Sequence, residues 1–177
     1  MRIAAAIGLG VWLTVTAFAA DLLAGLDEFD AGNYEGALEF WMPLAERGNA
    51  GAQYFIGLVY ENGYGVEVDY VQAAGWYARA AEAGNVDAQY NLGVMYQTGI
   101  GVAQDYAETL RLFTLAAEAG DLDAQFSLGL MYETGVGVEA DTGQALNWYG
   151  MAAAQGDADA ADAVAQLTAG IDPIITR

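Results

Sequence analysis

The sequence predicts an all-α protein, an α-solenoid of antiparallel helix pairs that repeat every 36 residues. The segment ENGYGVEVDY at residues 61–70 recurs as QTGIGVAQDY at 97–106 and as ETGVGVEADT at 133–142. Apolar residues between these segments fall at the spacing of one buried helix face. Glycines and an aspartate in each segment stand where one helix would end and the next would begin. Self-similarity with a period of about 20 to 50 residues is typical of stacked repeats, each of which buries its apolar face only against its neighbours.

Three full repeats and two partial ones account for most of the chain. Repeated glutamines, glycines, tyrosines and paired alanines align the copies. One partial copy matches the second half of a repeat, and the other matches the first half without its aromatic residues, as expected of a terminal cap. We therefore predict a lead-in at 20–28, a half repeat at 29–48, full repeats at 49–84, 85–120 and 121–156, a capping helix at 157–170 and a tail at 171–177.

Each repeat is interpreted as two helices joined by a glycine-containing turn. In the first repeat, Gly63 is expected to end the first helix, because glycine accepts the left-handed conformation of a helix C-cap. Asp69 is expected to cap the second helix, and Gln72 three residues later completes a capping box. Gly57 lies inside the first helix, where glycine costs roughly 1 kcal/mol relative to alanine. We expect close packing against the paired alanines of the second helix to offset this cost.

The turn Gly63-Tyr64-Gly65 also resembles glycine-rich loops that bind phosphate. A phosphate site needs free N–H groups at a positive helix end, but the start of the following helix carries a carboxylate that would repel phosphate. A calcium loop needs alternating oxygen ligands, and this turn has none. Because the turn recurs in every repeat, we interpret it as a structural connection. The sequence predicts neither a cofactor nor a metal site.

The composition restricts the classes of partner. The 177 residues include 24 acidic and 5 basic ones, which gives a net charge of −19. Such a charge repels the phosphates of nucleic acid and of anionic lipid, so we predict no nucleic-acid partner. Two explanations of the acidity stay open, a basic protein partner and a saline habitat in which an acidic surface keeps the protein soluble.

The sequence does not predict catalysis. Histidine, lysine and cysteine are absent, which removes the usual bases, nucleophiles and zinc ligands. The only serine, Ser127, has no base available for a catalytic triad. A pair of carboxylates is able to hydrolyse a glycosidic bond, but no acidic pair lies in a recognisable motif. We therefore expect a protein that is not an enzyme.

The N-terminus has the pattern of a secretory signal peptide, predicted over residues 1–19. Arg2 forms a short positive region, residues 3–16 are almost entirely apolar, and Ala17-Phe18-Ala19 provides small residues for cleavage after Ala19. The alternative is an uncleaved anchor, which the sequence disfavours because the apolar run is shorter than the roughly 20 residues of a spanning helix. We expect an exported protein, periplasmic or secreted, without stable membrane insertion after cleavage.

The repeats resemble the Sel-one-like repeat, a branch of the tetratricopeptide superfamily. The segment NVDAQYNLGVMYQTGIGVAQDY at 85–106 fits the family pattern almost letter for letter, and the resemblance covers about residues 29–170. Departures are few, with Ile56 in place of leucine and Leu112 in place of tryptophan. The resemblance implies a right-handed α-solenoid that serves as an adaptor or scaffold. An exported subgroup with paired cysteines has been linked to β-lactam binding, and this chain has no cysteine, so that activity is not carried over.

The resemblance also implies that the first helix of each pair lines the concave side of the solenoid. The outward positions of these helices recur at i, i+4 and i+7. We call them the aromatic–aliphatic ladder, with members Tyr54, Leu58, Glu61, Tyr90, Val94, Gln97, Phe126, Leu130 and Glu133. The ladder is the predicted binding surface for a partner segment of basic or amphipathic character. The other interpretation is that the ladder aromatics pack between adjacent repeats.

The predicted function is therefore a non-catalytic protein–protein interaction module, an adaptor, scaffold or regulator of the bacterial cell envelope. A solenoid presents a long surface for binding other macromolecules. The alternative is a structural component of an envelope assembly that binds through its ends.

Overall fold

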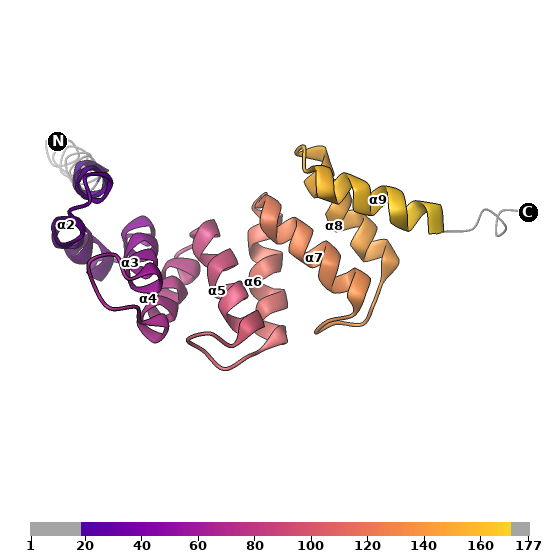
Figure 1. The fold of residues 1–177 in the computed structure, drawn as a ribbon, viewed down its shortest axis with the longest axis horizontal. Coiled ribbons are helices and arrows are strands. Elements are labelled where there is room, and N and C mark those ends of the chain that lie inside the picture. The colour runs from indigo at the N-terminus through magenta and orange to yellow at the C-terminus, as the bar shows by residue number, and fades with distance from the viewer. Residues whose placement is uncertain (1–18, 171–177) are drawn as a thin grey trace, which may run out of the picture. The chain divides into compact units, whose positions relative to one another are not determined.

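The computed structural model describes residues 19–170, which are helical and contain no strand (Figure 1). The predicted signal peptide, apart from Ala19, and the predicted tail at 171–177 lie outside the described residues. The chain divides into two compact units, Met1–Asn85 and Val86–Arg177.

The first unit contains four helices in its described part. A helix over residues 19–30 is followed by α2 (Tyr34–Glu46), α3 (Ala50–Asn62) and α4 (Tyr70–Glu82). Each labelled helix packs against the next, α2 on α3 and α3 on α4.

The core of the first unit is centred on Trp41. Its side chain is fully buried in one cluster with Ile56 and Val59. The indole Nε1–H donates a hydrogen bond to the carbonyl oxygen of Leu22 at 3.2 Å. The segment predicted only as a lead-in is thus a helix that covers this core. Its Gly25 lies against the Trp41 ring as Gly57 lies against the ring of Tyr77.

The second unit contains five helices in its described part, α5 (Val86–Thr98), α6 (Tyr106–Glu118), α7 (Leu122–Thr134), α8 (Thr142–Ala154) and α9 (Ala158–Gly170). Each of these helices packs against the next one along the chain. One core cluster joins Phe113 of α6 to Leu128 and Met131 of α7. Another joins Tyr149 of α8 to Ala160 of α9. The unit is therefore held together by contacts between neighbours in sequence.

The ends of the helices follow the predicted signals. Gly63 and Gly135 have φ near +71° and +74° and end α3 and α7 in the left-handed conformation. The Asp69 carboxylate accepts a hydrogen bond from the backbone N–H of Gln72 at the start of α4, and Asp105 and Asp141 cap α6 and α8 in the same way.

The second half of the predicted capping box does not form. A complete box has the side chain of Gln72 accepting a hydrogen bond from the backbone N–H of Asp69. That N–H donates instead to the carbonyl oxygen of Tyr60 at 2.9 Å. The short turn brings the start of α4 back alongside the end of α3, so a backbone acceptor takes the place of the side chain.

The helical glycines lie against aromatic rings rather than against the paired alanines. A Cβ atom added at Gly57, Gly93 or Gly129 would approach the ring of Tyr77, Phe113 or Tyr149, respectively, to within 2.6 Å. The alanine pair at 116–117 belongs instead to the core cluster with Leu128. The expected close packing is present, but its partner is the aromatic residue one turn earlier on the second helix.

Buried glutamines connect successive helix pairs. The Gln53 amide donates to the carbonyl oxygen of Ala45 at the end of α2, and the Gln125 amide donates to Ala117 at the end of α6. The side chain of Gln125 has a second bond, because Gln155 donates to its oxygen at 2.8 Å. The corresponding oxygen of Gln53 is buried and accepts no hydrogen bond.

Candidate binding surface

The ladder residues of the first repeat lie on α3 and are partly buried. The ring of Tyr54 packs against Tyr77 with centroids 5.9 Å apart. The Tyr77 hydroxyl donates a hydrogen bond to the Glu61 carboxylate at 2.5 Å. Leu58 is also partly buried. Glu61 is thus bound to the second helix of its own repeat and is not a free rim charge.

The third repeat has the same arrangement. Phe126 packs against Tyr149 with centroids 5.3 Å apart, and the Tyr149 hydroxyl donates to the Glu133 carboxylate at 2.7 Å. Burial raises the pKa of the Tyr149 hydroxyl, and the bonded Glu133 raises it further. The phenol therefore stays protonated as a donor. Leu130, between these residues on α7, is 45% exposed.

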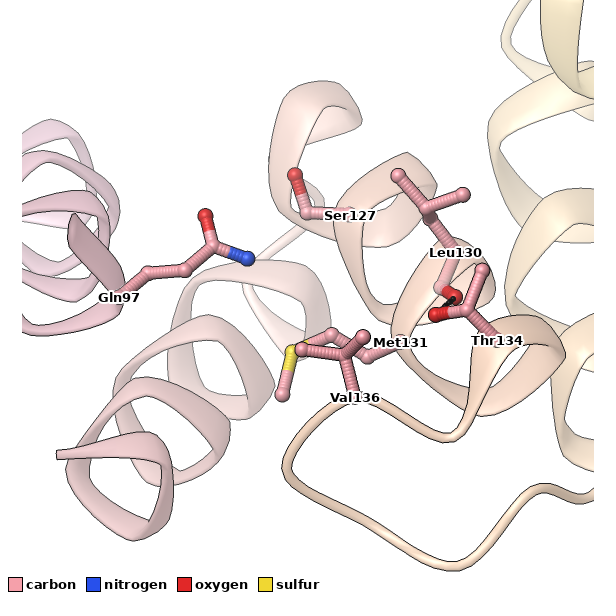
Figure 2. A pocket seen from close by; sticks show the side chains of 6 residues that line it. All are labelled: Gln97, Ser127, Leu130, Met131, Thr134 and Val136. Carbon is pink, nitrogen blue, oxygen red and sulfur yellow. Dashed lines mark hydrogen bonds between the residues drawn. The ribbon is translucent and has the colours of Figure 1, made fainter.

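The second repeat differs at this place. Tyr90 stacks on Phe113 with centroids 5.3 Å apart and ring planes at 23°. Phe113 has no hydroxyl, and Gln97 stands where the other repeats have glutamate. The side chain of Gln97 reaches from α5 toward α7 (Figure 2). Its neutral amide is therefore not bound to an aromatic hydroxyl.

Each ladder aromatic thus packs against the second helix of its own repeat, and Tyr90 also packs against the core cluster that includes Leu128 of the next repeat. Tyr54, Tyr90 and Phe126 each contact the aromatic residue of the second helix of the same pair. Tyr90 also hydrogen-bonds to the side chain of Ser127 on α7. Each of these rings is only partly buried.

A pocket of about 250 Å³ lies between α5 and α7, which we call the α5–α7 pocket. Its lining residues are Gln97, Ser127, Leu130, Met131, Thr134 and Val136 (Figure 2). Met131 is buried and forms part of the core, whereas Leu130 and Val136 are 45% and 43% exposed. The pocket thus has an apolar floor and sides, with the amide of Gln97 and the hydroxyls of Ser127 and Thr134 as its polar groups.

The residues of this region form one stripe on each helix. Positions three or four residues apart share a helix face, so Tyr90, Val94 and Gln97 form the stripe of α5, and Ser127, Leu130 and Thr134 that of α7. The α5–α7 surface is the name used below for these two stripes. Of the predicted ladder residues, the structure brings Gln97 and Leu130 to one pocket, with Tyr90 bonded to Ser127 beside it and Val94 against the core.

Acidic residues lie at the N-terminal ends of both stripes. Burial raises the pKa of the Asp121 carboxyl, the hydrogen bond from the Ala124 N–H opposes this, and the charges of Asp123 and Asp87 raise it further. Burial also raises the pKa of the Tyr90 hydroxyl, its bond to Ser127 lowers it, and Asp123 raises it again. These carboxylates therefore repel one another near the ladder aromatic of α5.

Sequence reasoning missed much of this site. It selected Leu130 and Gln97, but not the residues around them, Ser127, Met131, Thr134 and Val136. A signal was present, because Asp123, Ser127, Leu130 and Thr134 recur at i, i+4, i+7 and i+11. The second repeat also differs from the other two here, because it has phenylalanine and glutamine where they have tyrosine and glutamate. This difference was a second signal of the site.

Within residues 19–170, no helix is long and apolar enough to span a bilayer. The same residues contain no cluster of acidic side chains arranged to hold a metal ion.

Comparisons with known proteins identify the repeats. The Sel1 repeat model matches residues 50–85, 86–121 and 122–157. A protective antigen of uropathogenic Escherichia coli strains, whose crystal structure displays an SLR fold, is 40% identical, with a TM-score of 0.79 over 85% of this chain and 33% of its own. A Sel1 repeat protein from Oxalobacter formigenes is 39% identical, with a TM-score of 0.75 over 81% of this chain and 58% of its own.

The chain therefore spans about a third of the first of these structures and somewhat more than half of the second. A structure from Klebsiella pneumoniae subsp. pneumoniae, at 19% identity and a TM-score of 0.52, shares the fold alone. No curated protein matches the chain. Because the family model covers more than half of its residues, the chain belongs to the Sel1 repeat family, whose all-α solenoids generally serve as protein–protein interaction modules.

Proposed function

We propose that this protein is a non-catalytic interaction module of the bacterial cell envelope, an adaptor, scaffold or regulator that binds a segment of a partner protein. One observation carries the proposal. The first helices α5 and α7 leave apolar side chains partly exposed around a pocket, in a unit that is otherwise strongly acidic. Exposed apolar groups inside a polar rim are typical of a protein–protein contact.

The residue chemistry supports binding rather than catalysis. The sequence has no histidine, lysine or cysteine. Ser127 is hydrogen-bonded to Tyr90 at the edge of the pocket, and a serine nucleophile needs a neighbouring base. The groups that line the α5–α7 pocket are amide, hydroxyl and aliphatic groups, which suit the recognition of a peptide.

Export is the part of the proposal that rests on the N-terminal sequence. The expected product begins at Ala20, because Ala17-Phe18-Ala19 follows an apolar run. Intact-mass measurement of the protein from its own host tests this. A mature protein that retains Met1 or Arg2 would contradict the proposed location.

Affinity capture from the host tests the binding function. The bait is the exported protein, with Tyr90→Ala and Leu130→Gln as variants of the α5–α7 surface. Leu115→Gln is the matched control, since Leu115 lies on α6 away from the pocket and is similarly exposed at 40%. We expect the wild type and the control to retain one partner that both surface variants lose. Truncation of an interface hot spot costs about 2 kcal/mol or more, so the Tyr90→Ala loss should be visible as faster dissociation.

Thermal melting of each variant separates binding from folding. If Tyr90→Ala unfolds while Leu130→Gln stays folded and binds fully, the ladder has a structural role and the partner docks elsewhere. Recovery of a complex of fixed stoichiometry that neither variant disturbs would favour an assembly component that binds through its ends. A wild type that retains no protein would contradict the interaction function itself.

A further inference from the structure

The α5–α7 surface has two chemically different ends. Asp87 and Asp123 lie in the first turns of α5 and α7, and Asp121 caps α7. The α5–α7 pocket lies toward the other end, around Leu130. Seven residues of helix separate Asp123 from Leu130, which corresponds to about 10 Å along the axis. A partner segment bound along this surface would therefore contact carboxylates at one end and an apolar pocket at the other.

In the described part of their unit, residues 86–170, the carboxylates at the first end pair with no basic side chain. Residues 86–170 contain 12 acidic residues and a single basic one, Arg111. Arg111 lies on α6, where its guanidinium pairs with Glu108 at 2.9 Å. Asp121 is only partly exposed and is repelled by Asp123 and Asp87. A cation brought by a partner would therefore relieve a repulsion that this unit leaves in place.

The pocket end of the surface also has a polar group suited to a main chain. The Gln97 amide has both a donor and an acceptor, and it projects toward α7 (Figure 2). In the third repeat the corresponding Glu133 is bound to the Tyr149 hydroxyl. The Phe113 ring behind Gln97 offers no such bond, so the amide is available to a ligand.

From these three features we propose that the α5–α7 surface binds an extended partner segment with a lysine or arginine three or four residues away from a leucine, isoleucine or methionine. The basic side chain lies against Asp87 and Asp123, and the aliphatic side chain enters the α5–α7 pocket. An extended chain advances about 3.3 Å per residue, so three or four residues cover the distance between the two ends. Gln97, which lines the same pocket, hydrogen-bonds to the main chain beside the aliphatic residue. The inference rests on the proposed interaction function and adds the chemistry of the segment.

Charge and size favour a partner protein over the other occupants. A second copy of the chain carries the same net charge of −19, and two such surfaces repel each other. A nucleic acid is repelled for the same reason. A small cation alone leaves the pocket empty, although burial of an aliphatic side chain supplies most of the binding free energy here.

Selection from phage-displayed random dodecapeptides on the full-length purified protein tests the proposal. The expected consensus has a basic residue separated from an aliphatic one by two or three positions. Peptides of that consensus are then synthesised and their Kd is measured by fluorescence polarisation. We expect Leu130→Gln to weaken binding by about tenfold or more, which is the effect of losing one buried aliphatic contact. Leu115→Gln should leave Kd within about twofold.

The charge at the other end is tested separately. The double variant Asp87→Asn and Asp123→Asn should weaken binding several-fold and flatten its dependence on NaCl. Its control removes two exposed acids that lie away from this surface, Glu118→Gln and Glu139→Gln, and should have little effect. A consensus without a basic residue, or full binding by Leu130→Gln, would overturn the proposal. So would binding that appears only after residues 171–177 are deleted, because the occupant would then be the chain's own tail.

Partner capture distinguishes this inference from the function on which it rests. If a partner is retained by the wild type but its binding segment lacks the motif, the inference is wrong and the interaction function stands. If neither a partner nor a peptide is retained above an unrelated bait, both fail.

Discussion

The second repeat differs from the first and third repeats in one pair of interacting residues. In the first and third repeats, a tyrosine of the second helix holds a glutamate of the first, as Tyr149 holds Glu133 at 2.7 Å. In the second repeat, phenylalanine and glutamine replace both members. The aromatic rings nevertheless pack alike, since Tyr90–Phe113 and Phe126–Tyr149 both have centroids 5.3 Å apart.

The difference shows which features serve the scaffold and which are available for recognition. The ring is needed in every repeat because it fills the space beside the helical glycine. The hydroxyl and the carboxylate occur together or not at all, since the carboxylate accepts a hydrogen bond from that hydroxyl and a phenyl ring has no donor. Where both are absent, the neutral Gln97 amide faces the α5–α7 pocket.

The largest expected effect concerns the ring contact that all three repeats share. Gly129→Ala places a Cβ 2.5 Å from the Tyr149 ring, and Gly93→Ala places one 2.6 Å from the Phe113 ring. Overpacking of a core costs about 1–3 kcal/mol, and we expect both variants to lose this much in urea unfolding. Gly150→Ala is the control, because its Cβ meets nothing within 4 Å, and it should gain up to about 1 kcal/mol. Unequal losses at Gly93 and Gly129 would mean that the repeats pack differently.

The next effect isolates the pair that distinguishes the repeats. Tyr149→Phe should cost about 1 kcal/mol, because the Glu133 carboxylate loses its donor while remaining partly solvated. Adding Glu133→Gln reproduces the natural pair of the second repeat and should recover most of that loss. A double-mutant cycle in thermal unfolding measures the coupling. Additive losses would show that the two groups do not depend on each other.

The reverse exchange links the pair to binding. Phe113→Tyr with Gln97→Glu installs the pair in the second repeat and should leave stability nearly unchanged. The Kd of the peptides that hydrogen-bond to Gln97 should rise several-fold, because the new carboxylate is hydrogen-bonded to the new hydroxyl. If this double variant bound the peptides with unchanged Kd, Gln97 would have no part in peptide binding.

Sequence patterns predicted the repeated elements well because those elements are set by local chemistry. Gly63 ends α3 and Asp69 caps α4, and both features depend only on neighbours in the chain. The partners of the helical glycines were predicted wrongly, because spacing gives the helix that a residue faces but not the ring that fills the gap. The α5–α7 pocket was found only in part, since Val136 reaches it from a turn whose path the periodicity does not describe.

A smaller effect compares the buried glutamines. Gln53 has a buried side-chain oxygen without a donor, whereas Gln125 receives one from Gln155. Ala83 occupies the place of Gln155 and has nearly the same backbone conformation, with φ −80° against −85°. Ala83→Gln should therefore stabilise the protein by about 1 kcal/mol, the value of one hydrogen bond. Ala83→Met has similar length without the amide and should give no such gain. If Ala83→Met stabilised the protein equally, the gain would come from apolar contact and not from the hydrogen bond.

The smallest expected effect compares two helix caps. Asn49 accepts the Ala52 N–H at 2.9 Å, and Asp121 accepts the Ala124 N–H at 2.7 Å. Asparagine and aspartate cap helices about equally well, but Asp121 is also repelled by Asp123 and Asp87. Asp121→Asn should therefore stabilise the protein at neutral pH by about 0.5 kcal/mol, the size of an interaction between partly exposed charges.

The sign of its pH dependence follows from the raised pKa of Asp121. A raised carboxyl pKa means that the folded state favours the proton, so the wild type loses stability as pH rises through that pKa. The advantage of Asp121→Asn should be absent below the ordinary aspartate pKa of about 3.9 and complete above the raised value. It should also shrink in 1 M NaCl, where screening acts over about 3 Å, and in an Asp123→Asn background, where one source of repulsion is gone. A gain that is constant across pH and salt would originate in cap geometry, and the carboxylates beside Tyr90 would then need no cation from a partner.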